Sequence, residues 1–143
     1  MEPIDQALMD AKTIAVVGLD TRTWRTAHQI ARYLQDAGYK IYPVWFQQEA
    51  DEVLGEKAYG RIQDIPAQVD LVDVFVRSEQ TDAVIDDAIA AGAKALWLQV
   101  GITNDAGLRR AEEAGILVTQ DRCTMVEHRK MLRAKGQAPR AKG

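Results

Sequence analysis

Cysteine and histidine are scarce in this chain: its 143 residues include one cysteine, Cys123, and two histidines, His28 and His128. A single thiol excludes an internal disulfide and a zinc site built on several cysteines. The two histidines lie 100 residues apart, without the close spacing of metal ligands. We therefore predict no metal site, and we expect Cys123 to be a small, inert side chain.

Long apolar runs are absent as well. The longest hold about five residues, whereas a membrane-spanning helix needs roughly 20, and the first residues, MEPIDQALMDAK, lack the apolar core of a signal peptide. With 47% apolar and 27% charged residues, the chain has the balance of a globular protein rather than a disordered one. We expect a cytoplasmic protein with one domain over residues 1–132 and no contact with a membrane.

Acidic residues are missing from the end of the chain. Six of the 18 basic residues lie after residue 128, where no acid occurs, so residues 1–128 hold 12 basic and 21 acidic residues, a net charge of −9 against −3 for the whole chain. The acidic body argues against a nucleic-acid groove on the folded domain. We predict that residues 133–143 form a disordered basic tail, which is either simply solvated or touches RNA, an anionic lipid or an acidic partner.

Five short runs of β-forming residues recur along the chain, at 13–19, 40–45, 70–75, 95–100 and 116–119. Several are almost continuously apolar, which is typical of strands covered on both faces. Helical patterns lie before and between them, at 2–11, 26–37, 81–91, 104–114 and 124–132. This alternation predicts an α/β fold of Rossmann-like type, in three layers, with a parallel sheet of about five strands. Residues 46–66 depart from the pattern and predict a loop with at most one short helix at 61–64.

Two pairs of residues fit the capping box that opens a helix, Thr26 with Gln29 and Thr124 with Glu127. Both pairs predict that the threonine hydroxyl caps the helix that follows. On the first of these helices His28 falls on the polar side, so we expect it at the surface.

The turn after the first strand, GLDTRTWRT, has the composition of an anion site. In an open parallel sheet, ligands bind beyond the carboxyl ends of the strands, where the strand order reverses. Gly18 allows a sharp turn there, and the next helix points its N–H groups at it. Thr21 and Thr26 add hydroxyls, while Arg22 and Arg25 add planar donors suited to phosphate. We interpret the turn as a phosphate site; the alternative is a solvated loop whose arginines pair with neighbouring acids.

A nicotinamide dinucleotide fits this turn poorly. The second and third glycines of G-x-G-x-x-G are missing, and so is the acid that usually follows the second strand. That strand ends instead in Pro43, Val44, Trp45 and Phe46. The two aromatic rings offer flat surfaces for an adenine, or they pack in an ordinary core or interface. NAD(P) is therefore disfavoured as the ligand.

Four segments together carry a family resemblance. They are IAVVGL at 14–19, LGEKAYGRIQDIP at 54–66 with VDLVDVFVR at 69–77, GAKALWLQVGI at 92–102, and DRCTMVEHR at 121–129. In this order and spacing they resemble the small stand-alone CoA-binding proteins, which are similar to the CoA-binding domain of the succinyl-CoA synthetase α subunit. The resemblance covers about residues 4–132. It implies the same Rossmann-like fold and the binding of coenzyme A, or a related adenine nucleotide, without a reaction of its own.

The resemblance also implies which segments face the ligand. The turn after the first strand receives the phosphates, the end of the second strand flanks the adenosine half, the loop after the third covers the nucleotide, and the turn after the fourth lies nearer the pantetheine arm. In that order the implied residues are Gly18, Leu19, Asp20, Thr21 and Arg22; Pro43, Val44 and Trp45; Phe75, Val76 and Arg77; and Gln99, Gly101 and Ile102. The donors Arg25 and Thr26 of the first turn complete the candidate site.

The chain departs from the family pattern in this same region. It has Trp24-Arg25-Thr26 where relatives often carry Arg-Pro-Ser, and Trp45-Phe46 where they usually have Asn-Pro after the second strand. Many relatives also carry a second arginine beside Arg77, where this chain has a valine. These departures leave room for a different nucleotide.

No nucleophile–base pair stands out, so we predict no catalytic residue. Our leading hypothesis is a non-catalytic, regulatory or carrier module that binds coenzyme A, alone, with a protein partner or as a homo-oligomer. Three alternatives stay open. They are an NAD(P)-dependent oxidoreductase, a subunit of an acyl-CoA ligase complex, and a ligand-free interaction protein whose pocket is filled by Trp24 and Trp45.

Overall fold

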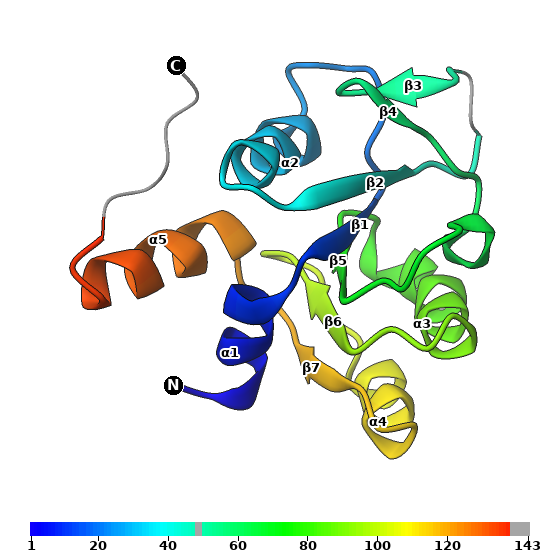
Figure 1. Cartoon of the computed structure of the whole chain (residues 1–143). Helices are drawn as coiled ribbons and strands as arrows, with labels where there is room; N and C mark the ends of the chain where they lie inside the picture. Colours follow the sequence, from blue (N-terminus) through cyan, green and yellow to red (C-terminus); the bar gives the residue numbers. More distant parts are fainter. Residues whose placement is uncertain (48–49, 138–143) are drawn as a thin grey trace.

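The computed structural model describes residues 1–47 and 50–137 (Figure 1). In chain order its elements are α1 (Pro3–Asp10), β1 (Thr13–Val17), α2 (Thr26–Asp36), β2 (Lys40–Val44), β3 (Glu52–Val53), β4 (Glu56–Lys57), the 3-10 helix η1 (Ile62–Asp64), β5 (Leu71–Val74), the 3-10 helix η2 (Ser78–Gln80), α3 (Thr81–Ala90), β6 (Ala95–Leu98), α4 (Asp105–Glu113), β7 (Leu117–Thr119) and α5 (Thr124–Ala134).

Five strands form one parallel sheet in the order β2-β1-β5-β6-β7. The predicted α/β class and the parallel sheet are confirmed. The first four strands end one or two residues before their predicted ends, whereas β7 ends at Thr119 as predicted. At β1, for example, Gly18 already has a φ of 95°, which turns the chain away from the strand direction.

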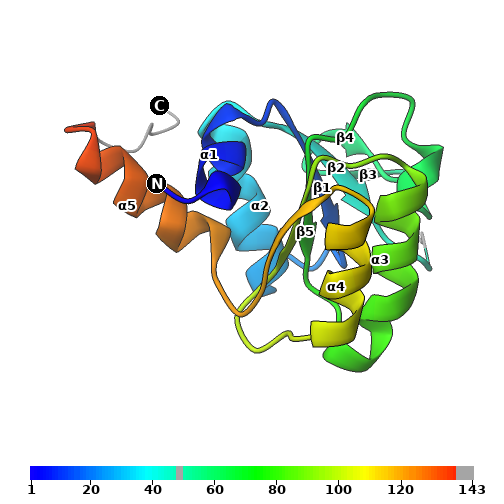
Figure 2. The same cartoon turned by 90° about the horizontal axis from the view of Figure 1, so that it is seen from below.

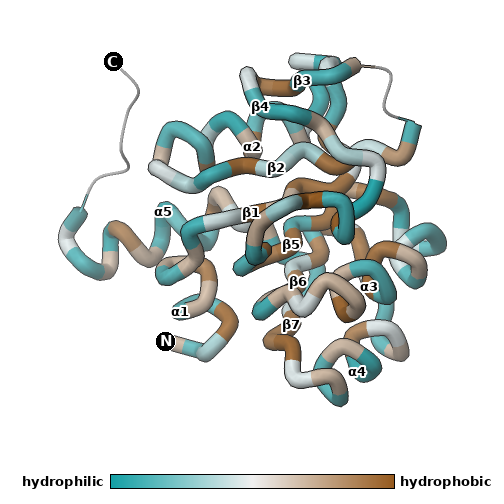
Figure 3. The backbone as a smooth tube through the Cα atoms, turned by 45° about the vertical axis from the view of Figure 1, so that its right-hand side comes forward, coloured by the Kyte–Doolittle hydropathy of each residue, from teal (hydrophilic) through white to brown (hydrophobic). Residues whose placement is uncertain are grey.

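Helices cover both faces of the sheet, which gives the three predicted layers (Figure 2). Alternate residues of a strand point to opposite faces, so Val17 of β1 packs with α3 and α4, whereas Val16 packs with α1, α2 and α5. Trp97 of β6 is fully buried on the α2 and α5 side. In Figure 3 the hydrophobic colour gathers along these central strands, as double-sided burial requires.

The segment predicted as a loop contains a small antiparallel hairpin, β3 with β4. Its turn residues, Leu54 and Gly55, both have positive φ, 55° and 74°, as a two-residue hairpin turn requires. The chain then returns along the edge of β2: Tyr59 donates its N–H to Pro43 O at 2.9 Å, and Trp45 donates to Tyr59 O at 2.8 Å. The segment after the hairpin therefore pairs with β2 through Tyr59 and covers that edge of the sheet next to the candidate site. The predicted short helix at 61–64 corresponds to η1.

Both predicted capping boxes are wrong. Thr26 and Thr124 are the first helical residues rather than caps, and no side-chain cap bond forms at Arg25 or Cys123, which precede them. The hydroxyl of Thr124 is used elsewhere, because it donates to the buried carboxylate of Asp73 at 2.9 Å. A tertiary partner has replaced the local one.

The helices differ from the sequence predictions in the burial of His28 and in the end of α5. His28 is buried, 9% exposed, rather than at the surface. Helix α5 continues through Ala134, so the first residues of the predicted tail are helical, and residues 138–143 of that tail lie outside the described residues. Across the described ranges, no helix is long and apolar enough to cross a membrane.

Candidate functional site

The strand order reverses at β1. Strand β2 lies on one side of β1 and β5 on the other, although β5 follows β2 along the chain. The carboxyl ends of the three strands are tied together there, because Gly18 donates to Val44 O at 2.9 Å and Phe75 donates to Val17 O at 2.9 Å. The turns that follow β1, β2 and β5 therefore leave the sheet side by side, at the place where parallel sheets bind ligands.

Gly18 is required by this close approach. A Cβ atom at this position would lie 3.2 Å from the backbone C and O of Phe75, and its φ of 95° is itself unfavourable for other residues. The missing side chain brings the first candidate turn against the loop after β5. The structure thus brings these two candidate segments together.

Within the first turn, Arg22 is held by an acid. Asp20 is buried, and its carboxylate accepts the backbone N–H and the Nε–H of Arg22, each at 2.9 Å, and also forms an ion pair with Arg22 Nη2. The Arg22 guanidinium keeps the pKa of the Asp20 carboxyl below its usual range. For Arg22 the alternative interpretation, an arginine paired with a neighbouring acid, describes the structure. A ligand phosphate at this turn has to share this guanidinium with Asp20.

The amino end of α2 faces the same turn. Its N-cap, Arg25, makes no side-chain cap bond, and its first turn holds no acid. Thr21, Arg25 and Thr26 are exposed. A helix end without its own counter-charge favours an anion.

The aromatic residues of the first two turns do not fill a pocket together. Trp24 is 72% exposed and Phe46 is 49% exposed, whereas Trp45 is half-buried behind Pro43 and Val44, which are buried. The ligand-free alternative needs both Trp24 and Trp45 to fill the pocket, and Trp24 does not do so. Trp24 projects into solvent.

A pocket of 380 Å³ opens between the loops that follow β5 and β6. Its lining residues are Phe75, Val76, Arg77, Ser78, Glu79, Gly101 and Ile102. Five of them belong to the set implied by the family resemblance, so the third and fourth candidate segments meet in space. The apolar Phe75, Val76 and Ile102 stand beside polar groups at the rim.

A larger pocket, of 660 Å³, lies at the opposite edge of the sheet. Its central carboxylate, Asp70, accepts the N–H groups of Lys12 and Thr13 at 2.8 and 3.3 Å and pairs with Lys94 at 3.4 Å. Burial opposes the charge of Asp70, but these backbone donors and Lys94 lower its pKa overall. Because these polar groups already satisfy one another, size alone does not make this pocket the better candidate.

Gln99 does not face the ligand edge. It is buried, and its amide donates to Asp73 Oδ1 at 2.6 Å and to Thr124 Oγ1 at 2.9 Å. Burial raises the pKa of Asp73 to about 7, although the hydrogen bonds that its carboxylate accepts from Gln99 and Thr124 lower this pKa. This polar cluster joins β5, the residue after β6 and the start of α5. An acid in the middle of an apolar strand is the sequence signal that points to it.

The turn after β6 is fixed by side chains that sequence reasoning missed. Asp121 accepts the N–H of Gly101 at 2.7 Å, and Gln120 accepts the N–H of Asn104 at 2.8 Å. Asp121 has a positive φ of 56°. The turn that carries Gly101 and Ile102 is thus held from the chain that follows β7.

Comparison with known proteins decides the family. The chain matches the model of the family described as CoA binding domain over residues 12–129. It belongs to this family. The predicted resemblance is confirmed.

Relatives of this CoA-binding domain are of two sizes. The Bacillus subtilis (strain 168) protein named Uncharacterized protein YneT is 39% identical over 125 residues, which cover 87% of this chain and 91% of that protein. The ADP-forming acetate–CoA ligase I subunit alpha of Pyrococcus furiosus is 29% identical over 93 residues, which cover 62% of this chain and 20% of the subunit. The chain thus spans about a fifth of the length of this ligase subunit.

A solved structure shares the fold closely. The hypothetical protein from Pyrococcus horikoshii OT3 superimposes with a TM-score of 0.84 at 36% identity, covering 92% of this chain and 97% of that one. The single α/β domain described above is therefore the fold of its structural relatives too.

Proposed function

We propose that this protein binds coenzyme A at the carboxyl edge of its sheet and acts as a binding module without a reaction of its own. The observation that carries the proposal is the match to the CoA-binding domain family over residues 12–129. The contact between Gly18 and Phe75 supports the location, because it joins two candidate turns at the point of strand reversal.

Each segment of this edge suits a different part of the ligand. The phosphates lie at the turn after β1, near the uncapped end of α2 and the guanidinium of Arg22. Trp45 flanks the adenosine half. The resemblance implies that the loop after β5 covers the nucleotide, but Val76 of this loop shares a pocket with Ile102, and the apolar surface there suits the alkyl groups of the pantetheine arm, which we place in this pocket.

The composition of the pocket supports a binding role rather than catalysis. Of its lining residues, Ser78 carries the one hydroxyl, and its oxygen accepts the N–H of Thr103 at 3.0 Å. The lining contains no histidine or cysteine. In the described part of the chain, no side chain that could act as a general base forms a hydrogen bond with the Ser78 hydroxyl. A nucleophile without a base within hydrogen-bond reach is not activated.

Thermal unfolding of the full chain with coenzyme A, dephospho-coenzyme A, ADP and NAD tests the proposal. A ligand that binds only the folded state adds about 2.7 kcal/mol at 100 times its dissociation constant. We expect coenzyme A to give the largest shift. No shift with any ligand rejects the proposal, and a larger shift with NAD than with coenzyme A favours the oxidoreductase alternative.

A second candidate is a CoA-binding subunit of an ADP-forming acyl-CoA ligase complex. It is favoured by the similarity to the acetate–CoA ligase subunit of Pyrococcus furiosus, of which this chain spans 20%. Such a role needs a partner that supplies nucleotide chemistry. Purification with bound partners, followed by an assay for ATP-dependent acyl-CoA formation, tests it; activity that co-elutes with the chain supports the candidate, and a chain that elutes alone and inactive opposes it.

A further inference from the structure

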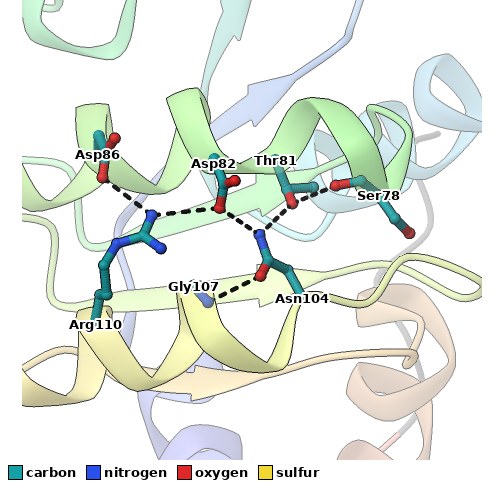
Figure 4. Close-up of polar contacts among 7 residues, drawn as sticks. All are labelled: Ser78, Thr81, Asp82, Asp86, Asn104, Gly107 and Arg110. Atoms are coloured by element: carbon teal, nitrogen blue, oxygen red, sulfur yellow. Dashed lines mark hydrogen bonds and ion pairs between the residues drawn. The ribbon is translucent and has the colours of Figure 1, made fainter.

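The pocket between the loops after β5 and β6 has two walls that belong to different helix entrances. One wall, residues 75–79, leads into α3, and the other, residues 101–102, leads into α4. Residues 75–77 and 101–102 are loop and residues 78–79 begin η2, so no strand of the sheet sets the separation of the walls. Asp121 and Gln120 hold the second wall from the chain after β7, and a group of polar side chains at the starts of α3 and α4 joins this wall to the first (Figure 4).

Asn104 is the centre of this group. As the N-cap of α4, its Oδ1 accepts the N–H of Gly107 at 2.8 Å. Its Nδ2 donates to two oxygens on α3, Thr81 Oγ1 and Asp82 Oδ1, both at 2.8 Å. This amide is the main reason that the pKa of Asp82 lies below its usual range. One side chain thus caps its own helix and holds the neighbouring one.

The hydrogen bonds continue from Asn104 into the pocket wall. Thr81 is fully buried, and its hydroxyl donates to Ser78 O at 2.6 Å. The hydroxyl oxygen of Ser78 accepts the N–H of Thr103 at 3.0 Å, and Thr103 precedes Asn104 in the chain. Ser78, Thr81, Asn104 and Thr103 therefore form a closed ring that joins the two walls.

Close packing beside the ring restricts its movement. A Cβ atom at Gly107 would lie 2.5 Å from Ile85 Cδ1 and 2.7 Å from Asn104 Nδ2. Only glycine lets α4 approach α3 this closely, which keeps the Asn104 amide within reach of α3. By contrast Arg110, one turn further along α4, makes only long bonds to Asp82 and Asp86, at 3.4 and 3.2 Å. Both acids are exposed, so this pair contributes little.

The geometry points to Asn104 as a positioning residue that sets the width of the pocket for the pantetheine arm of coenzyme A, acting through Thr81 and Ser78 rather than by touching the ligand. This inference rests on the proposed function. Asn104 does not line the pocket. Its effect should therefore appear in the binding of the arm and not in the binding of the nucleotide half, which lies on the far side of β5 at β1 and β2.

Titration calorimetry with coenzyme A and with ADP, which lacks the arm, tests this role. N104S keeps a good N-cap oxygen but removes the amide donor, and T81V breaks the same ring from the opposite helix. We expect each variant to bind coenzyme A about tenfold more weakly, the loss that follows from one or two hydrogen bonds. The affinity for ADP should stay within about twofold, since no bond at the first turn changes. R110A is the matched control, because it removes the outer ion pair and leaves the ring intact.

The outcomes separate the inference from the proposed function. Equal losses for coenzyme A and ADP, or no loss with N104S and T81V, would show that the ring is merely structural and overturn the inference while coenzyme A still binds the unmodified chain. If one variant fails to fold, the other alone decides between these outcomes. If the unmodified chain binds no coenzyme A, the proposed function fails and the positioning role fails with it.

Discussion

Asp20 and Arg22 form an ion pair inside the turn where an anion is expected. The carboxylate lies 2 residues before the guanidinium and is 3% exposed, so its charge is shielded from solvent but not from a ligand in the turn. A phosphate that approaches Arg22 is attracted by the guanidinium and repelled by the carboxylate of Asp20. The Asp20–Arg22 pair is therefore close to electrically neutral, which leaves Arg25 as the unbalanced positive charge of the turn, and the attraction that Arg22 offers depends on how firmly Asp20 holds it.

Replacing Asp20 by asparagine should strengthen coenzyme A binding. D20N retains a carbonyl oxygen for the N–H of Arg22 but removes the charge that competes with phosphate. We expect an affinity gain of about three- to tenfold, the usual size of one partly solvated charge contact, measured by titration calorimetry at low salt. R22A in the same background should abolish the gain. Equal affinity of D20N and the unmodified chain would mean that the phosphates bind elsewhere.

An alanine at position 18 should destabilise the fold more than an alanine at another glycine of similar backbone angle. Gly18 and Gly115 have φ of 95° and 88°, but a Cβ has no neighbour within 4 Å at Gly115, whereas at Gly18 it meets Phe75. G115A reports the backbone strain, about 1 kcal/mol or somewhat more. G18A adds the contact and should cost about 1–3 kcal/mol beyond it. Urea unfolding measures both, and equal costs would contradict the close approach.

The buried Asp73 should make stability fall as pH rises. Its folded pKa, about 7, lies above the ordinary value of 3.8, so the folded state binds the proton more tightly than the unfolded state. Stability attributable to this group is therefore complete below about pH 4, is lost between about pH 4 and pH 7, and is constant above that. D73N cannot ionise. Its stability relative to the unmodified chain should rise across this window and then level off.

Guanidinium unfolding at several pH values measures the difference. Burial lowers the pKa of His128, which destabilises the fold as pH falls below about 6.5. This contribution is common to both proteins and cancels in the comparison. A stability difference between D73N and the unmodified chain that does not change with pH would show that folding does not raise the pKa of Asp73.

Truncation of Trp97 should lower the stability of the fold strongly, whereas truncation of Trp24 should hardly change it. Trp97 is fully buried and its indole N–H donates to Arg122 O at 2.8 Å, so W97A should cost about 3–5 kcal/mol. Trp24 is 72% exposed, and W24A should change the unfolding free energy by no more than about 0.5 kcal/mol. Thermal unfolding measures both. A large loss in W24A would instead support the alternative in which this ring fills a pocket.

The central strands β1, β5 and β6 were predictable because they are buried on both faces, which leaves an apolar run such as that of Val16 and Val17 in the sequence. The hairpin of β3 and β4 was not, since its strands have two residues each and its turn is Leu54-Gly55 rather than Asn-Gly. A period-2 pattern cannot be recognised in two residues. The pairing of the following segment with the edge of β2 could therefore not be predicted from the sequence either.

The candidate site was predictable as a set of segments, but not in the direction of each side chain. That Arg22 has a nearby acid is evident in the sequence, whereas its choice of Asp20 depends on the fold of the turn. Gln99 follows a strand like the other candidates, yet its amide turns inward to a carboxylate 26 residues away. Asn104 was predicted to start a helix; its second role needs α3, which only the tertiary structure brings near.

The uncapped end of α2 has a consequence for the rate at which an anion arrives. Of α2, α3, α4 and α5, all of which begin at the carboxyl edge, the last three carry Asp82, Asp105 and Glu127 in their first turns, and α2 carries no acid there. At long range a polyanion meets repulsion from the chain, whose net charge is −3 in total and −9 over residues 1–128. Salt screens such fields beyond about 8–10 Å, but it acts less on a dipole at contact. Capture should thus accelerate with ionic strength, the reverse of ordinary electrostatic steering.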